Sequence, residues 1–461
     1  MSLFQCDFLD RKAVRQIIVT LMVISVAVSD IAYYELHSPL RNAIFGFSVL
    51  VLVALLIGRC RLDVTPSVRL SSAVFVFYVS SAIVSSASVG FSHEAVDSLE
   101  NYSHFLAGAF LLPFLVRLRP SYACLLVAVG MASFANGLYA IRELAEFGLE
   151  HQAAGSKGKA IPFGDISMLV AMLCILGGIY WSAIDRRRSL LLFGAAAFGL
   201  FAGIASQSRG GWLFFPVGIV VCALYLLQRH IGYRLRIGGA ALAICAVLLF
   251  ALSQIDLIGK RIESASGEIT FMLSGGTATP DSTSLIDRRD MWRAALTAFA
   301  EHPLLGIGLG QMNGYFKEAY EAGLMSESVI RYNQGFGHTH AHNDYLHAAA
   351  TRGLPGLISL VLMYGVPLWL SFGAARRSPN DDSYRAGAYS GVMLITAYMT
   401  FSLTDSVLHM KGTNGLFVIL CCWTLVIFLA DPRTRPLSEC VSPRDATTPA
   451  SNPASGPASR Q

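Results

Sequence analysis

Four histidines lie within the ten residues from His338 to His347, where the longest polar segment of the chain runs into an apolar one. Histidine can take up and return a proton near neutral pH, because its ordinary pKa is about 6.5. Packing of an apolar core does not require histidine at this density. We therefore interpret this histidine segment as a catalytic site, and the rest of the chain as the structure that brings substrates to it.

The elements that must position these histidines are those of a membrane protein. Apolar residues make up 54% of the 461 residues and charged residues 14%, about half the charge of a soluble domain. The sequence predicts an all-α, polytopic integral membrane protein of about 12 transmembrane helices, since a helix of ~20 apolar residues crosses a bilayer. The predicted spans are 14–34, 42–58, 70–90, 103–116, 121–140, 163–183, 189–206, 211–228, 236–253, 354–373, 386–403 and 413–430.

The basic residues predict the orientation of these spans. With the N-terminus in the cytoplasm, 17 basic residues lie at the N-terminus and in the inner loops, against six in the short outer loops. Cytoplasmic loops are enriched in Lys and Arg, so we expect both termini inside and the histidine segment outside. The net charge of +5 comes from span ends rather than from one basic patch, which argues against nucleic-acid binding.

The spans divide the chain into four predicted regions. One outer segment, 254–353, is long enough to fold outside the bilayer, and its residues 287–299 have the pattern of an amphipathic helix lying along the membrane surface. A shorter outer segment, about 141–162, is interpreted as a mobile flap. The regions are transmembrane helices 1–9 in 1–253, the periplasmic loop domain with the catalytic motif in 254–353, helices 10–12 in 354–430, and a disordered cytoplasmic tail in 431–461.

Three motifs on the predicted outer face resemble one known family. The pair His342-Asn343 is followed after nine residues by a glycine-rich turn that begins at Gly353. The other two motifs are Ser206–Trp212, and Arg288-x-x-x-Trp292 followed by His302–Gly308. The three together resemble the bacterial O-antigen ligase/polymerase family, whose members share a Wzy-C type domain. The resemblance covers about residues 200–360 and implies a GT-C-like glycosyltransferase in the bacterial inner membrane, with a periplasmic active site.

The resemblance also implies the substrates and the roles of individual residues. The donor would be an O-antigen linked to undecaprenyl diphosphate, and the acceptor a sugar of lipid A-core. The enzyme would also contact membrane lipids and would need no cofactor. Guanidinium groups bind phosphate oxygens in bidentate geometry, so Arg209 and Arg288 are candidates to bind the diphosphate, with Arg289 a rival for Arg288. Arg288 would also assist departure of the diphosphate, and His342 would be the general base that activates the acceptor hydroxyl.

Other interpretations of the same residues remain open. His338 is the alternative base, and His338 and His340 could instead orient His342. A metal site built from His338, His340, His342 and Asp344 is conceivable, but the resemblance implies no metal, and neither a cysteine nor an outer carboxylate pair supports one. The run Gly306–Gly310 lacks the spacing of a nucleotide-binding loop and is interpreted as a flexible turn.

Two residues near the last outer turn, Asp405 and His409, could also face the site but are left outside the predicted set. At the level of function, the O-antigen ligase is the leading interpretation. Its alternatives are an O-antigen polymerase, a related protein O-oligosaccharyltransferase and, from another class, a lipid-linked glycan flippase. One dominant outer loop favours the ligase over the polymerase, and the histidine segment argues against the flippase.

Overall fold

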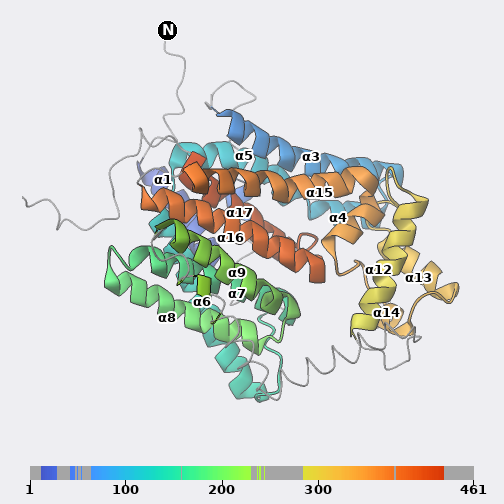
Figure 1. Cartoon of the computed structure of the whole chain (residues 1–461). Coiled ribbons are helices and arrows are strands. Elements are labelled where there is room, and N and C mark those ends of the chain that lie inside the picture. The colour runs from blue at the N-terminus through green and yellow to red at the C-terminus, as the bar shows by residue number, and fades with distance from the viewer. Residues whose placement is uncertain are drawn as a thin grey trace, which may run out of the picture. The chain divides into compact units, whose positions relative to one another are not determined.

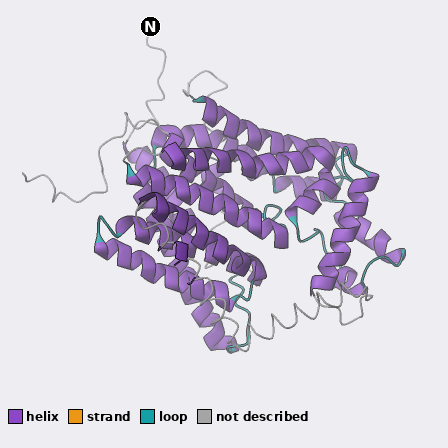
Figure 2. Cartoon of the chain, viewed as in Figure 1, coloured by secondary structure: helices purple, strands orange, loops and turns teal. Residues whose placement is uncertain are grey.

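The described elements of a computed structural model are all helices (Figure 2). The structure describes residues 12–27, 64–156, 158–229, 284–377 and 381–429, with a few more positions within 42–53 and 236–243. These residues all belong to one compact unit of the chain. The helices are α1 (Lys12–Ala27), α3 (Pro66–Ser88), α4 (His93–Glu100), α5 (Ser103–Leu118), α6 (Tyr122–Phe147), α7 (Ala160–Trp181), α8 (Arg186–Ala205), α9 (Arg209–Arg229), α12 (Ser284–Glu301), α13 (Met312–Glu321), α14 (Glu327–Arg331), α15 (Asp344–Arg377), α16 (Asp382–Thr404) and α17 (Lys411–Leu429) (Figure 1).

Eight of these helices are long and apolar enough to cross a membrane, namely α3, α6, α7, α8, α9, α15, α16 and α17. The prediction of an all-helical, multi-pass membrane protein is therefore confirmed. Each of the eight coincides with a predicted span. Two further predicted spans are helices of only 16 residues, α1 and α5. The last two, 42–58 and 236–253, lie largely outside the described residues, as does the tail after Ala430.

Polar residues just before the helices explain where several of them begin. The side chains of Thr65, Ser121, Asp185 and Asp381 accept hydrogen bonds from backbone N–H groups in the first turns of α3, α6, α8 and α16. Such caps satisfy N–H groups that have no partner inside the helix. Because the apolar runs are bounded by these residues in the sequence, the span boundaries were predictable to within a few residues.

The helices differ in how much of their surface the protein covers. In α17, 94% of the apolar window is buried, against 33% in α8, so α17 is central and α8 peripheral. Helix α16 contacts α7, α9, α15 and α17. The end of α16 and the turn that joins it to α17 therefore lie within a well-packed group of helices, which is the kind of support that a precise site requires.

Helices α12, α13 and α14 form a separate small core at one end of the long helices (Figure 1). Met291, Ala295 and Ala298 of α12 are buried against Phe316 of α13 and Val329 of α14. The amphipathic helix predicted at 287–299 is thus present, extended to Ser284–Glu301. Its apolar face is covered by protein.

Helix α15 is interrupted at Gly353, whose φ of 64° and ψ of −157° are not helical. The preceding loop supplies backbone partners there: Ile307 N–H donates to the Ala350 carbonyl at 2.9 Å, and Leu354 N–H to the Pro303 carbonyl at 2.8 Å. A Cβ on Gly306 would lie 2.3 Å from the Thr351 carbonyl carbon. The glycine run predicted as a turn is therefore a turn whose backbone packs directly on the break in α15.

The predicted flap is shorter than expected. Helix α6 continues to Phe147, so the loop before α7 comprises residues 148–159. The Glu143 carboxylate accepts the N–H groups of Ala154 and Gly155 at 2.9 and 3.3 Å. This end of α6 therefore ties the loop to the helix bundle.

A histidine and aspartate candidate active site

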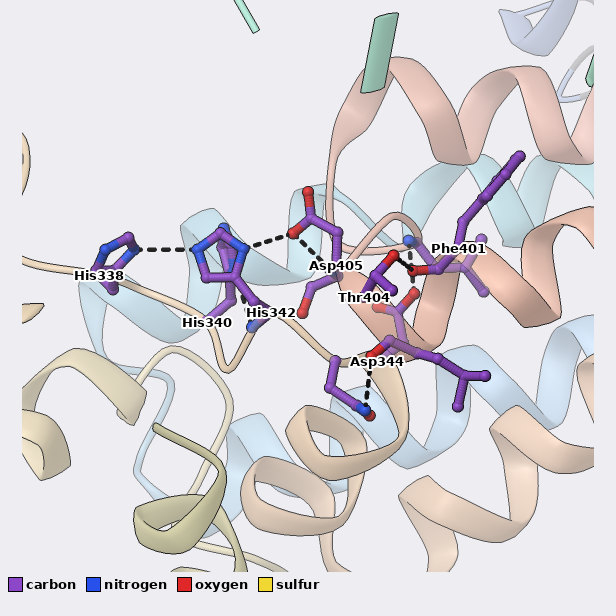
Figure 3. Close-up of polar contacts among 11 residues, drawn as sticks. His338, His340, His342, Asp344, Phe401, Thr404 and Asp405 are labelled. Atoms are coloured by element: carbon purple, nitrogen blue, oxygen red, sulfur yellow. Dashed lines mark hydrogen bonds and ion pairs between the residues drawn. The ribbon is translucent and has the colours of Figure 1, made fainter. Parts of the chain in front are cut away.

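The histidine segment is organised by a hydrogen-bonded chain of three side chains. His342 Nδ1 lies 2.9 Å from Asp405 Oδ1, and His342 Nε2 lies 3.2 Å from His338 Nδ1. Figure 3 shows the His342 ring between the other two. Side-chain exposure is 15% for His342 and 2% for Asp405, so the aspartate is the inner end of the chain and the histidines lead outward.

The protonation of this chain follows from its geometry. Burial alone would raise the pKa of the Asp405 carboxyl, but the hydrogen bond and the charge of His342 outweigh burial and lower this pKa below its usual range. An ionised carboxylate only accepts, so the His342 Nδ1–H donates to it. In the neutral form of His342, Nε2 carries a lone pair that can accept the His338 Nδ1–H. The arrangement would let His342 Nε2 take up a proton, with Asp405 stabilising the imidazolium that forms.

The two neighbouring histidines are neutral at pH 7. Burial, followed by the positive charges of His342 and Arg288, lowers the pKa of His338 to about 4. Burial and then His342 also lower the pKa of His340. The His340 Nδ1 accepts the backbone N–H of His342 at 3.4 Å, which leaves its proton on Nε2. Both neighbours therefore act as hydrogen-bonding groups, and His342 is the ring that pairs with Asp405.

Asn343 and Asp344 hold the histidine segment against the turn between α16 and α17. Asn343 Oδ1 caps α15 by accepting the Leu346 N–H at 3.0 Å, and its Nδ2 donates to the Leu403 carbonyl at 3.2 Å. Asp344 Oδ2 accepts from Ser402 Oγ at 2.7 Å and from the Leu408 N–H at 3.1 Å. These bonds fix the backbone on both sides of Asp405 relative to His342.

The backbone of His342 itself is in a left-handed conformation, with a φ of 47°. This region is uncommon for residues other than glycine, although histidine tolerates it better than most. Residues held there tend to cluster at functional sites, where the surrounding structure determines the conformation. The cap that Asn343 makes on Leu346, together with the bonds of Asp344 to Ser402 and Leu408, holds this turn.

A second group of polar residues comes from α7 and the start of α9. Ser208 Oγ donates to Asp165 Oδ1 at 2.6 Å, and the Gly211 N–H also donates to this carboxylate. Arg209, between them, is half-buried at the first position of α9. A Cβ on Gly210 would lie 2.6 Å from Thr404 Oγ1 and 2.8 Å from Asp165 Oδ1. Glycine there lets α9 approach the end of α16, next to Asp405.

Arg288 connects the two groups, whereas Arg289 has a partner in its own helix. Arg288 interacts electrostatically with His338 and with Asp165. Arg289 donates through Nε and Nη2 to Asp290 Oδ1 at 3.0 and 2.9 Å. The structure thus joins His342 and His338 in a chain with Asp405, and of the two rival arginines Arg288 is the one that acts on a histidine of this chain.

Sequence reasoning left Asp405 and Asp165 out of the site. The signal for Asp405 was present, because an ionisable residue at the end of an apolar span is a functional candidate. The residues that could hold a metal ion also differ from the predicted set. His340, His342 and Asp405 offer ligand atoms within 4.8 Å of one another. Asp344 faces Ser402 and the turn after α16 instead (Figure 3).

The structure is that of a multi-pass helical membrane protein in which His342 pairs with the buried Asp405 and Arg288 acts electrostatically on the neighbouring His338. Residues 194–361 match the family model described as O-antigen ligase, so this part of the chain is an O-antigen ligase family domain. The chain is also 25% identical over 353 residues to an uncharacterized protein of Haemophilus influenzae, covering 76% of this chain and 84% of that protein. The family resemblance predicted from the motifs is confirmed.

Proposed function

We infer from the matched family domain that this chain is a membrane glycosyltransferase of the O-antigen ligase/polymerase type, a class that acts on lipid-linked glycans. We propose that the chain is the ligase: an inverting, metal-independent enzyme that transfers O-antigen polysaccharide from undecaprenyl diphosphate to a sugar of lipid A-core. The site would face the periplasm, with both termini in the cytoplasm, and the product would be complete lipopolysaccharide. The observation that carries the proposal is the Asp405–His342 pair, with Arg288 acting electrostatically on the neighbouring His338.

The reaction is one displacement at the anomeric carbon of the donor. His342 Nε2 takes the proton of the acceptor hydroxyl, whose oxygen forms the new bond to the anomeric carbon. The bond from that carbon to the diphosphate oxygen breaks, and its electron pair leaves with the lipid diphosphate. Attack from the opposite face inverts the configuration, and the Asp405 carboxylate stabilises the imidazolium that forms, as in other His–Asp pairs.

Arg209 and Arg288 would bind the diphosphate and offset the charge that develops on it as it leaves. Charge-assisted bonds to phosphate are roughly twice as strong as neutral ones. His338 has a different part. Its Nδ1–H occupies His342 Nε2 at 3.2 Å, so the acceptor hydroxyl must take its place before proton transfer. His338 therefore blocks Nε2 of the base until the acceptor hydroxyl displaces it, and His342 is the base itself.

The test is complementation of a deletion strain, read on lipopolysaccharide gels. A strain without this gene should lose the whole O-antigen ladder and accumulate polymer on the lipid carrier. Wild-type protein and the exposed-histidine control His93→Ala should restore the ladder. The His342→Ala variant should insert normally but not restore it, since positioned general bases contribute ~10²–10⁴-fold. A single-repeat band in the deletion strain would assign a polymerase, and an unchanged ladder would refute glycan transfer to lipid A-core.

A further inference from the structure

A cavity of about 290 Å³ opens beside the histidine cluster, on the side of His340. His340 and His409 line it together with Lys159 and Lys411. The His340 ring centroid is 4.4 Å from that of His342, so a group in the cavity is separated from the proposed base by a single imidazole. The cavity is therefore continuous with the site but is not formed by its arginines.

Two helix N-termini contribute to the lining of this cavity. Helix α7 begins at Ala160, directly after Lys159, and helix α17 begins at Lys411. Residues of the first turns of both helices, Phe163 and Gly412 among them, are lining residues. The first N–H groups of a helix have no acceptor within it, and the helix dipole makes this end favourable for an anion.

The side chains of the cavity add to the same preference. Among the described residues that line it, two are lysines and none is acidic. Lys411 also forms an ion pair with Glu100, outside the lining. His340 accepts at Nδ1 and therefore carries its proton on Nε2, while His409 Nδ1 has no hydrogen-bond partner in the described part of the chain. His340 thus offers an N–H group to a ligand, while the His409 Nδ1 is itself buried.

Backbone hydrogen bonds fix the position of Lys159. Its backbone N–H donates to the Ala154 carbonyl at 2.9 Å, and Ala154 is in turn held by the Glu143 carboxylate. The side chain is exposed at the cavity rim and acts electrostatically on His409. The loop before α7, which the sequence suggested as a flap, therefore presents a cation to the cavity.

We infer that this cavity binds a phosphate group of the acceptor saccharide, an inference that rests on the proposed function. Two lysines and two helix N-termini supply the positive potential that a phosphate requires. The arginines proposed for the donor diphosphate do not line this cavity, and Arg288 acts on His338 rather than on a lining residue. The two proposed anion-binding regions are therefore built from different residues, with His342 next to a histidine of each. A phosphate anchored in the cavity would hold the acceptor with its hydroxyl near His342 Nε2.

The test compares purified wild-type protein with Lys159→Glu and with Lys317→Glu, which reverses an exposed lysine on α13. Transfer is measured with a phosphorylated acceptor and with the same acceptor after phosphatase treatment. In Lys159→Glu, KM for the phosphorylated acceptor should rise roughly tenfold or more, the loss of one charged hydrogen bond. The KM for the donor and for the dephosphorylated acceptor should be those of wild type, and Lys317→Glu should change neither.

Each other result has a definite meaning. A rise confined to KM for the donor would assign the cavity to the donor diphosphate and overturn its assignment to the acceptor phosphate. Unchanged kinetics in an active Lys159→Glu enzyme would overturn the phosphate site. Equilibrium dialysis with radiolabelled inorganic phosphate supplies a readout without transfer. Binding that Lys159→Glu abolishes would support the site even if wild-type protein transferred no glycan, an outcome that would refute the proposed function alone.

Discussion

Replacement of Asp405 by Asn tests the proton transfer most directly. The carboxylate is 2% exposed and its Oδ1 is 2.9 Å from His342 Nδ1, so solvent screens the pair very little. Asn keeps the size and an acceptor oxygen but removes the charge. A hydrogen bond to a charged group contributes ~1.5–3 kcal/mol. Asn would lose this energy only in the transition state, where the imidazolium forms. The loss corresponds to a decrease of roughly 10–150-fold in kcat/KM.

The assay is transfer by the purified protein as a function of pH, with donor binding measured in parallel. Asp405→Asn should bind donor as wild type does. The acidic limb of its kcat/KM profile should move to lower pH, because imidazolium without the neighbouring carboxylate is less favourable and gives up its proton sooner. The exposed pair of His93 and Asp97, 3.3 Å apart at 87% and 70% exposure, provides the control. Asp97→Asn should change neither the rate nor the profile.

A purely structural role for Asp405 makes a different prediction. It would lower expression and thermal stability together with activity, and would leave the pH profile of the remaining enzyme in place. A folded Asp405→Asn protein with wild-type kcat/KM and an unmoved acidic limb would refute the assignment of His342 as a base assisted by Asp405.

Three further predictions concern other parts of the site. Arg209→Ala and Arg288→Ala should each lose most transfer through weaker donor binding, and Lys at either position should rescue only part of it. Arg289→Ala should retain activity, because Arg289 is paired with Asp290. Donor-binding assays on the three variants check this ranking. Transfer should survive exhaustive EDTA treatment, and activity that one divalent ion restores would instead give His340, His342 and Asp405 a ligand role. The protein should lose thermal stability in detergent as pH falls from about 6.5 to about 4. Burial lowers the pKa of both His338 and His409 to about 4, so the unfolded chain binds more protons throughout that window. The decrease in melting temperature should be smaller in His338→Asn, and an equal decrease would contradict this cause.

The spans were the most predictable part of the fold, for a physical reason. A helix in lipid needs an uninterrupted apolar run, and eight such runs are helices at the expected places. The start of α15 was less predictable. Its first turns, from Asp344, carry polar residues that are buried against the α16–α17 turn, and hydropathy alone does not distinguish them from a loop.

The candidate site could be proposed from the sequence in its local part and not in its tertiary part. The motif resemblance selected His342, with His338 as the alternative base, and outer-face placement beside the motifs selected Arg209 and Arg288; the roles of these residues stay predictions. The pairing of His342 with Asp405 joins residues 63 positions apart, and that of Ser208 with Asp165 joins residues 43 apart. Composition and periodicity carry no information on which of several span ends meet. The packing of α7, α9 and α16 against one another decides which span ends meet.

The family domain ends at residue 361, before the carboxylate on which the proposed base depends. Asp405 follows α16, and the cavity lysines precede α7 and begin α17, so all three lie outside the matched segment. The matched segment therefore carries the base and the arginines, while flanking helices supply the ion that stabilises the base and the cations proposed for the acceptor. Asn343 and Asp344 join the two parts, since their side chains bond to residues 402–408. Under the proposed function, this arrangement would let the flanking helices differ with the acceptor while the displacement chemistry stays the same. Exchange of the loop before α7 between two such proteins should then change acceptor preference and leave donor preference in place.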